Sequence, residues 1–305
     1  MKIYVAGHNG MVGSACVRAL KSKGYQKIIT VSSKELDLRE SEKVNNFIKS
    51  NSPDIIICAA AKVGGIMANY EKPYEFLIDN LKIQNNLITS SHNNNVNKFI
   101  FLGSSCIYPK FAKQPLKEEY LLSGALEPTN ESYALAKISG IKLIQAINRQ
   151  FSKKYVSLMP TNLYGQNDNF DLKTSHVLPA LIRKFHEAKL SNSPFVNLWG
   201  TGNPMREFLH VDDLADAIIF SFENELENDL YNIGTGKDLS IKDLSLLIKN
   251  IVGYDGEIKW DISKPDGTPR KLLDTSRFEK MGWKASINLE DGIKSVYEWY
   301  KEQYK

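Results

Sequence analysis

The chain has 305 residues, enough for one large domain or two ordinary ones, and its 42% hydrophobic and 24% charged residues are typical of a globular protein. Its net charge of +4 is spread out, without a cluster of Lys or Arg, so we expect no nucleic-acid partner and no membrane-surface role. There is no apolar run near the roughly 20 residues of a membrane span and no export signal, which predicts a cytoplasmic protein. The cysteines, Cys16, Cys58 and Cys106, are far apart in apolar surroundings and are expected to be reduced thiols.

The N-terminal half alternates short apolar runs with segments in which apolar residues recur at helical spacing. We expect strands over 2–6, 28–31, 55–59 and 99–103, and helices over 12–20, 41–50 and 73–91. Strands that are apolar along their whole length are buried on both faces, and a helix between successive strands forces parallel pairing. This half is therefore predicted to form a Rossmann-type, doubly wound parallel α/β sheet.

The second half begins with an expected helix over 130–151, a strand over 155–159 and a break over 160–165. Beyond residue 165 the regular alternation is lost. We therefore predict two discontinuous domains. The larger binds a dinucleotide and comprises residues 1–165 and 206–236; the smaller is an α/β substrate-binding domain of residues 166–205 and 237–305.

A glycine-rich turn follows the first predicted strand and opens the first helix. Gly7, Gly10 and Gly13 have the spacing G-x-x-G-x-x-G. Such glycines permit a sharp turn, let the backbone approach a pyrophosphate and bring helix and strand close together, while the helix N-terminus supplies N–H donors. We expect dinucleotide binding here rather than a tight turn without a ligand. Further expected contacts are Asn9, Met11 and Val12.

The end of the second predicted strand bears on the choice of cofactor. An NAD enzyme usually has an acidic residue there, whereas this chain has Ser32, Ser33 and Lys34. Two hydroxyls and an ammonium group suit a 2′-phosphate, so we predict NADPH/NADP+. Other expected cofactor neighbours are Asp37 and Leu38 at the adenine, and the small residues Ala59, Ala60 and Ala61 at the ribose. Ordinary loop chemistry and close packing explain these five residues equally well.

Tyr133 and Lys137 are four residues apart on a predicted helix and therefore share one face. A neighbouring ammonium stabilises phenolate, which predicts a pKa for Tyr133 below its usual value of about 10. A tyrosine of that kind can donate a proton to a developing alkoxide near neutral pH. The spacing alone is weak evidence, because such pairs arise by chance on many helices.

With these features in order, the chain resembles the extended short-chain dehydrogenase/reductases, and within them the GDP-L-fucose synthase family. The resemblance covers essentially the whole chain. It rests on A-A-A-K-V-G-G-I at 59–66, L-G-S-S-C-I-Y-P-K at 102–110, E-P-T-N-E-S-Y at 127–133, M-P-T-N-L-Y-G at 159–165 and P-M-R-E-F-L-H-V-D-D at 204–213.

The resemblance implies a GDP-linked 4-keto-6-deoxy sugar that is epimerised at C3 and C5 and then reduced at C4 by NADPH. A C4 ketone acidifies the protons on C3 and C5, and the family motifs put Cys106 and His176 in place as base and acid. Both a thiol and an imidazole can exchange protons near neutral pH after modest tuning.

For the reduction, the resemblance implies that Tyr133 protonates the C4 oxygen and that Ser104 holds this oxygen by a hydrogen bond. Lys137 would also bind the nicotinamide ribose. Ser105 competes with Ser104 for the serine role.

The resemblance further implies a set of binding residues. The nicotinamide half of the cofactor is expected beside Pro160, Asn162, Leu163 and His176. The GDP-sugar is expected beside Asn162, Lys184, Trp199, Arg206 and Asp266. Trp199 offers a flat surface for guanine or a sugar face, and Arg206 and Lys184 suit a diphosphate. Arg183 and Arg270 stay open as alternatives, and no metal site is expected.

One departure from the family concerns the cofactor phosphate. Where relatives often carry arginines, this chain has Asn9, Ser32 and Ser33, which leaves Lys34 as the main nearby cation. We therefore expect a weaker preference for NADPH than is usual in the family.

Three functions stay open at this point. The first is a bifunctional epimerase/reductase that makes GDP-L-fucose or a related GDP-sugar. The second is a C4 reductase of a GDP-4-keto-hexose or GDP-4-keto-heptose, with epimerisation done by another enzyme. The third is a non-catalytic NADP(H) sensor. A homodimer is expected through the helices over 73–91 and 130–151, as is typical of the superfamily.

Overall fold

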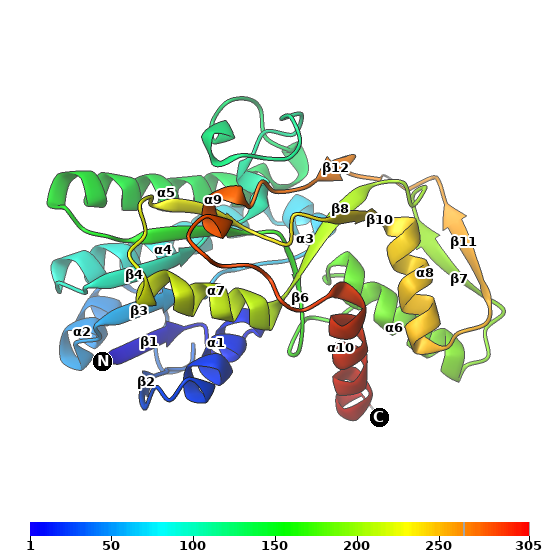
Figure 1. Cartoon of the computed structure of the whole chain (residues 1–305), viewed down its shortest axis with the longest axis horizontal. Helices are drawn as coiled ribbons and strands as arrows, with labels where there is room; N and C mark the ends of the chain where they lie inside the picture. Colours follow the sequence, from blue (N-terminus) through cyan, green and yellow to red (C-terminus); the bar gives the residue numbers. More distant parts are fainter. Residues whose placement is uncertain (265, 305) are drawn as a thin grey trace.

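The computed structural model describes residues 1–264 and 266–304. Its larger part is built on a six-stranded sheet in which every pairing is parallel (Figure 1). The strand order is β2 (Lys27–Ile29), β1 (Lys2–Ala6), β3 (Ile55–Cys58), β4 (Lys98–Leu102), β5 (Val156–Pro160) and β9 (Leu230–Ile233). The prediction of a doubly wound parallel sheet is confirmed.

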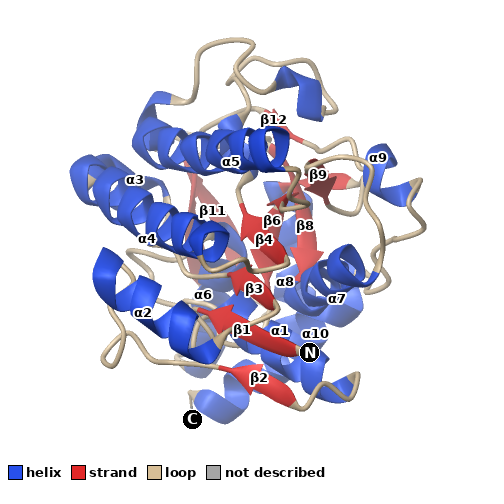
Figure 2. Ribbon diagram, turned by 90° about the vertical axis from the view of Figure 1, so that its left-hand side faces the viewer, coloured by secondary structure: helices blue, strands red, loops and turns tan. Residues whose placement is uncertain are grey.

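Helices cover both faces of this sheet (Figure 2). One face carries α1 (Met11–Ser22) and α7 (Val211–Glu223), and the other carries α2 (Ser41–Asn51), α4 (Pro73–Asn93) and α5 (Glu131–Phe151). Alternate residues of a strand point to opposite faces. Accordingly, Ile3 and Val5 pack in the core beneath α1 and α7, whereas Tyr4 and Ala6 pack in the core beneath the other three helices.

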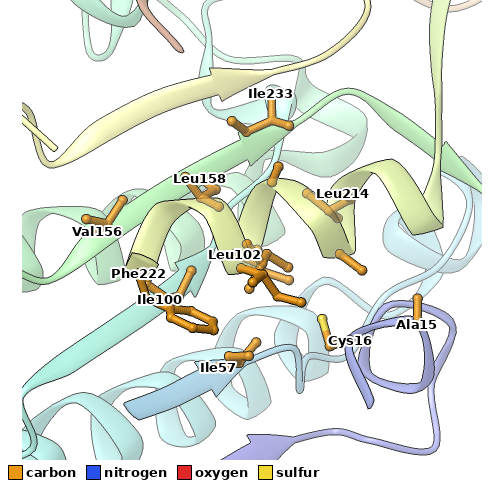
Figure 3. Packing of buried hydrophobic residues seen from close by; sticks show 14 of the residues in the cluster. Ala15, Cys16, Ile57, Ile100, Leu102, Val156, Leu158, Leu214, Phe222 and Ile233 are labelled. Carbon is orange, nitrogen blue, oxygen red and sulfur yellow. The ribbon is translucent and has the colours of Figure 1, made fainter. Parts of the chain in front are cut away.

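The core beneath α1 and α7 is mostly aliphatic, as Figure 3 shows for Leu102, Leu158 and Leu214. Strand β1 lies between β2 and β3. From β1 the chain adds β2 on one side and then crosses back to add β3 and the later strands on the other side, so the strand order reverses beside β1. In open α/β sheets, ligands bind in the crevice at the carboxyl ends of the strands beside such a reversal. The fold therefore directs attention to the segments that follow β1, β3 and β4.

A second group of strands lies beyond the carboxyl ends of the main sheet (Figure 1). Strand β8 (Met205–His210) pairs with β6 (Asn162–Tyr164), β10 (Asp238–Ser240) and β12 (Arg270–Lys271), and β7 (Phe195–Trp199) pairs with β11 (Glu257–Asp261). A third core joins these strands to α6 (Val177–Leu190), α8 (Ile241–Val252) and α10 (Leu289–Gln303). The described residues also form two short α-helices, α3 (Ile66–Glu71) and α9 (Ser276–Glu279), and 3₁₀ turns over Ser105–Ile107, Glu118–Tyr120 and Pro128–Asn130.

The boundaries differ from the sequence prediction in two places. The segment expected as a break contains β6, and β8 pairs outside the main sheet although residues 206–236 were assigned to the larger domain. Conversely, Phe278 of α9 packs in the core beneath α1 and α7. The division into cofactor and substrate domains stays a prediction. No helix in the described part of the chain is both long and apolar enough to cross a bilayer.

Candidate active site

The glycine turn has the close backbone contacts that its spacing predicted. Gly7 has a φ of +85°, and a Cβ there would lie 2.7 Å from the backbone nitrogen of Ala60. A Cβ on Gly13 would lie 2.1 Å from the carbonyl oxygen of Gly7. Gly10 is the N-cap of α1 and makes no side-chain capping bond, so no cap side chain satisfies the first-turn N–H groups of this helix. These residues fit a cofactor pyrophosphate.

The segment after β2 that is expected to bind the 2′-phosphate also contains an acidic residue, Glu35. The Glu35 carboxylate accepts hydrogen bonds from the Ser32 hydroxyl (2.6 Å) and backbone nitrogen (3.1 Å). The expectation that both serine hydroxyls are available was therefore wrong for Ser32. Ser33 and Lys34 are exposed and remain candidates for the phosphate.

The expected adenine and ribose neighbours lie around the glycine turn. The amide of Ala59 donates to the Ala6 carbonyl at the end of β1, and Ala60 and Leu38 pack in one core cluster. Asp37 is bound by the Arg39 guanidinium (2.7 and 3.0 Å), which lowers the pKa of its carboxyl to about 2. Asp37 is therefore an anion already paired with a cation. Ala61 is half-buried beside these residues.

Tyr133 and Lys137 lie on one face of α5, but they do not form the expected hydroxyl–ammonium pair. The Lys137 ammonium donates to the Leu102 carbonyl (2.8 Å) and lies 5.6 Å from the centre of the Tyr133 ring. Burial raises the pKa of Tyr133, and the nearby Cys106 thiol adds to the effect. The prediction of a lowered tyrosine pKa was wrong, because burial disfavours the phenolate and the Lys137 ammonium is bonded to the Leu102 carbonyl instead of the tyrosine hydroxyl. The pKa of Lys137 is itself lowered by burial.

Ser104 and Cys106 follow β4 directly. Ser104 caps the short 3₁₀ turn Ser105–Ile107, and its hydroxyl accepts a hydrogen bond from the Cys106 amide (3.4 Å). Ser105 and Cys106 are buried. Burial raises the pKa of the Cys106 thiol, while the ammonium groups of Lys271 and Lys137 and the Ser104 hydroxyl oppose this shift. Because Lys137 binds the end of β4, α5 and this turn are fixed to one another.

Lys271 is a site residue that the sequence reasoning missed. It lies on β12 opposite Arg206 and lines one small cavity together with Cys106. Its ammonium lowers the pKa of both Cys106 and His176, so it links the two groups expected to exchange protons. The sequence pointed to Lys271 only by its position directly after Arg270, a residue that was kept as an alternative contact for the GDP-sugar.

His176 is the backbone N-cap of α6 and makes no side-chain capping bond. Its side chain is accessible to solvent, yet desolvation by the surrounding protein lowers the pKa of the imidazole, and the Lys271 ammonium adds to this effect. The segment before it is tied to the loop after β3, because the Gly65 amide donates to the Thr174 carbonyl (3.0 Å).

The expected nucleotide-binding residues form a second group near Lys271. Trp199 is 56% exposed, and the Lys184 ammonium lies 5.9 Å from its ring centre. Asp266 closes a turn by accepting hydrogen bonds from the Thr201 amide and hydroxyl (both 2.7 Å). Arg206 is half-buried, and burial lowers its pKa. The two alternative arginines are engaged elsewhere: Arg183 binds Glu187 and Arg270 binds Asp238.

The expected nicotinamide neighbours lie where β5 ends and β6 begins. Pro160 is the last residue of β5, and Leu163 packs toward the core beneath α1 and α7. The Asn162 side chain donates to the Glu207 carbonyl (2.8 Å) and joins β6 to β8. In residues 1–264 and 266–304, no group of three or more His, Cys, Asp or Glu could hold a metal ion.

Comparison with known proteins agrees with this geometry. Residues 3–234 match the NAD dependent epimerase/dehydratase family. The chain is 51% identical to GDP-L-fucose synthase of Escherichia coli K12, over 99% of this chain and 97% of that one. A GDP-6-OMe-4-keto-L-xylo-heptose reductase from C. jejuni has a similar structure (TM-score 0.94, 41% identity, 99% and 98% coverage), as does a GDP-mannoheptose C4 reductase from Campylobacter jejuni with NADP bound (0.90, 40%, 98% of both chains). The chain therefore belongs to the NAD dependent epimerase/dehydratase family, among its GDP-L-fucose synthase-like members.

Proposed function

We propose that the protein is an NADPH-dependent enzyme that epimerises a GDP-linked 4-keto-6-deoxy sugar at C3 and C5 and reduces it at C4, giving GDP-L-fucose or a closely related GDP-sugar. The observation that carries the proposal is the cavity wall shared by Cys106 and Lys271, with Ser104 beside it and Tyr133 and Lys137 on the adjoining helix. A simple ketoreductase needs the serine, tyrosine and lysine but has no use for a thiol there.

For the epimerisation, we assign Cys106 and His176 to opposite faces of the sugar ring. The Cys106 thiolate removes a proton from the carbon beside the ketone and leaves an enolate, to which the His176 imidazolium returns a proton. Exchange with water then resets both groups. Lys271 supports this role because its ammonium favours thiolate, against the burial that raises the thiol pKa.

Reduction assigns Tyr133 as the proton donor. The raised pKa of Tyr133 keeps the hydroxyl protonated, which is the form that a donor needs. Its proton passes to the C4 oxygen as this becomes an alkoxide, and the Ser104 hydroxyl donates a hydrogen bond to the same oxygen. Lys137 would hold the nicotinamide ribose. NADPH, when bound, supplies the hydride that C4 accepts.

The cofactor assignment is supported by the glycine turn and by the relative solved with NADP. Its pyrophosphate would lie at the first turn of α1, beside Asn9, Met11 and Val12. Lys34 and Ser33 would hold the 2′-phosphate.

A second candidate is a C4 reductase of a GDP-4-keto-heptose that leaves epimerisation to another protein. It is favoured by the structural similarity of this chain to the two C. jejuni enzymes, which are described as reductases of GDP-linked heptoses. Turnover of GDP-4-keto-6-deoxymannose with NADPH in D2O separates the candidates. Deuterium at C3 and C5 of the product supports the bifunctional enzyme, whereas a reduced product without deuterium at these carbons contradicts it.

We also propose a homodimer in the cytoplasm. Helices α4 and α5 lie side by side on the outside of the sheet (Figure 2), where Tyr74 (72% exposed) and Leu135 (42%) offer apolar contact to a second copy. The three cysteines are free and buried, which suits a reducing compartment. A mass in solution of one chain would contradict the dimer, and Leu135→Glu is expected to produce that monomer.

A further inference from the structure

We propose that Asn232, a buried residue outside the reaction site, is a positioning residue for the Cys106 turn and acts through the hydroxyl of Tyr108. The inference rests on the proposed function in assigning epimerisation to Cys106. Asn232 lies on β9 and is fully buried, and Tyr108 is 3% exposed. Neither residue has been given a role by the chemistry above.

The amide of Asn232 has hydrogen-bond partners on three sides. Its Oδ1 accepts a short hydrogen bond from the Tyr108 hydroxyl (2.5 Å). Its Nδ2 donates to the carbonyls of Leu116 (2.8 Å) and Asp274 (3.2 Å). Two carbonyls facing Nδ2 fix the orientation of the amide, since the reverse orientation would set oxygen against oxygen. The tyrosine hydroxyl must therefore be the donor to Oδ1.

These bonds join segments that carry the proton-exchanging groups. Tyr108 follows Cys106 by two residues, and Asp274 follows Lys271 by three. The two segments are further linked through residue 116, because its amide donates to the Leu272 carbonyl (2.7 Å) and its carbonyl accepts from the Asp274 amide (2.8 Å). Asn232 thus fixes two groups to one strand of the main sheet. They are the Cys106 thiol and the Lys271 ammonium, which lowers the pKa of that thiol.

The reductive groups are held in a different way. Lys137 is bound to the end of β4, Tyr133 is on the same helix, and Ser104 follows β4 directly, so none of the three is bonded to Asn232 or Tyr108. Reaction rates are sensitive to displacements of about 1 Å in a catalytic group. Loss of the Tyr108 hydroxyl, which lies two residues after Cys106 and four after Ser104, should therefore impair epimerisation much more than reduction.

Tyr108→Phe tests this inference, because it deletes the hydroxyl and keeps the ring in the core. Tyr155→Phe is a matched control. Tyr155 is also fully buried, and its hydroxyl donates to the Val96 carbonyl (3.0 Å) at the amino ends of the strands, away from the site. Both variants lose one buried hydrogen bond, so they should lose similar thermal stability.

Three rates are compared for the wild type and both variants: deuterium uptake from D2O at C3 and C5, NADPH oxidation with the epimerised 4-keto sugar, and alkylation of Cys106 by iodoacetamide, followed by mass spectrometry of its peptide. We expect Tyr108→Phe to slow deuterium uptake about tenfold and to change alkylation severalfold, with NADPH oxidation within about twofold of wild type. Tyr155→Phe should leave all three rates within about twofold.

Equal effects of the two variants, or equal slowing of uptake and NADPH oxidation by Tyr108→Phe, would overturn the inference. Failure of the proposed function looks different, since the wild type itself would then reduce the sugar without taking up deuterium. In that case alkylation decides: a Cys106 that reacts at the wild-type rate in Tyr108→Phe also overturns the positioning role.

Discussion

The substitution Gly13→Ala tests the geometry of the cofactor turn. A methyl group at this position would lie 2.1 Å from the carbonyl oxygen of Gly7 and 2.7 Å from the Cα of His8. Both neighbours are backbone atoms, so relief requires α1 to move away from the turn by roughly 1 Å. Overpacking of this kind costs about 1–3 kcal/mol. We expect a fall of about 2 kcal/mol in the free energy of unfolding without cofactor, and a loss of NADPH affinity of at least about tenfold.

Gly10→Ala is the matched control for this prediction. Its Cβ would meet the Gly7 carbonyl oxygen at an ordinary 3.5 Å, and Gly10 has a φ of −79°, which alanine adopts freely. We expect the unfolding free energy to stay within about 0.5 kcal/mol of wild type, while NADPH affinity falls because the methyl group blocks the approach of the pyrophosphate. Urea denaturation and NADPH titration by fluorescence measure the two effects. A Gly13→Ala protein as stable as Gly10→Ala would refute the argument from backbone contact.

Three further predictions follow from the site. Tyr133→Phe should lower the rate of NADPH oxidation by about 10²–10⁴ and spare deuterium uptake at C3 and C5, whereas Cys106→Ser should do the reverse; NMR of the products checks both, and parallel loss of both activities in either variant contradicts the assignment. Lys271→Met removes a cation that lowers the pKa of Cys106 and His176, so both pKa values rise and the pH profile of deuterium uptake moves to higher pH; a profile that stays in place or moves to lower pH rejects this role. Lys34→Met should raise the KM for NADPH about fivefold and leave that for NADH unchanged, and an equal change for both cofactors would argue against 2′-phosphate binding.

Local patterns in the sequence predicted most of the fold. The apolar run that became β3 is buried along its whole length, and the helical spacing over 130–151 became α5 almost to the residue. Such features depend on neighbours within one or two turns of the chain, so periodicity captures them. The elements outside the main sheet were harder to predict, since β6 and β12 have only three and two residues and exist through their pairing with β8.

The sequence by itself determined the chemistry that is present: a glycine turn at the first helix, a tyrosine and a lysine one helical turn apart, and a thiol two residues after a serine. Only the tertiary structure decided how those groups are tuned. Burial raises the pKa of Tyr133 although a lysine is near, Glu35 takes the hydroxyl of Ser32, and Lys271 reaches Cys106 from a distant part of the chain. The physical reason is that desolvation and charge–charge interactions depend on distances through space, which the folded chain sets and local spacing does not.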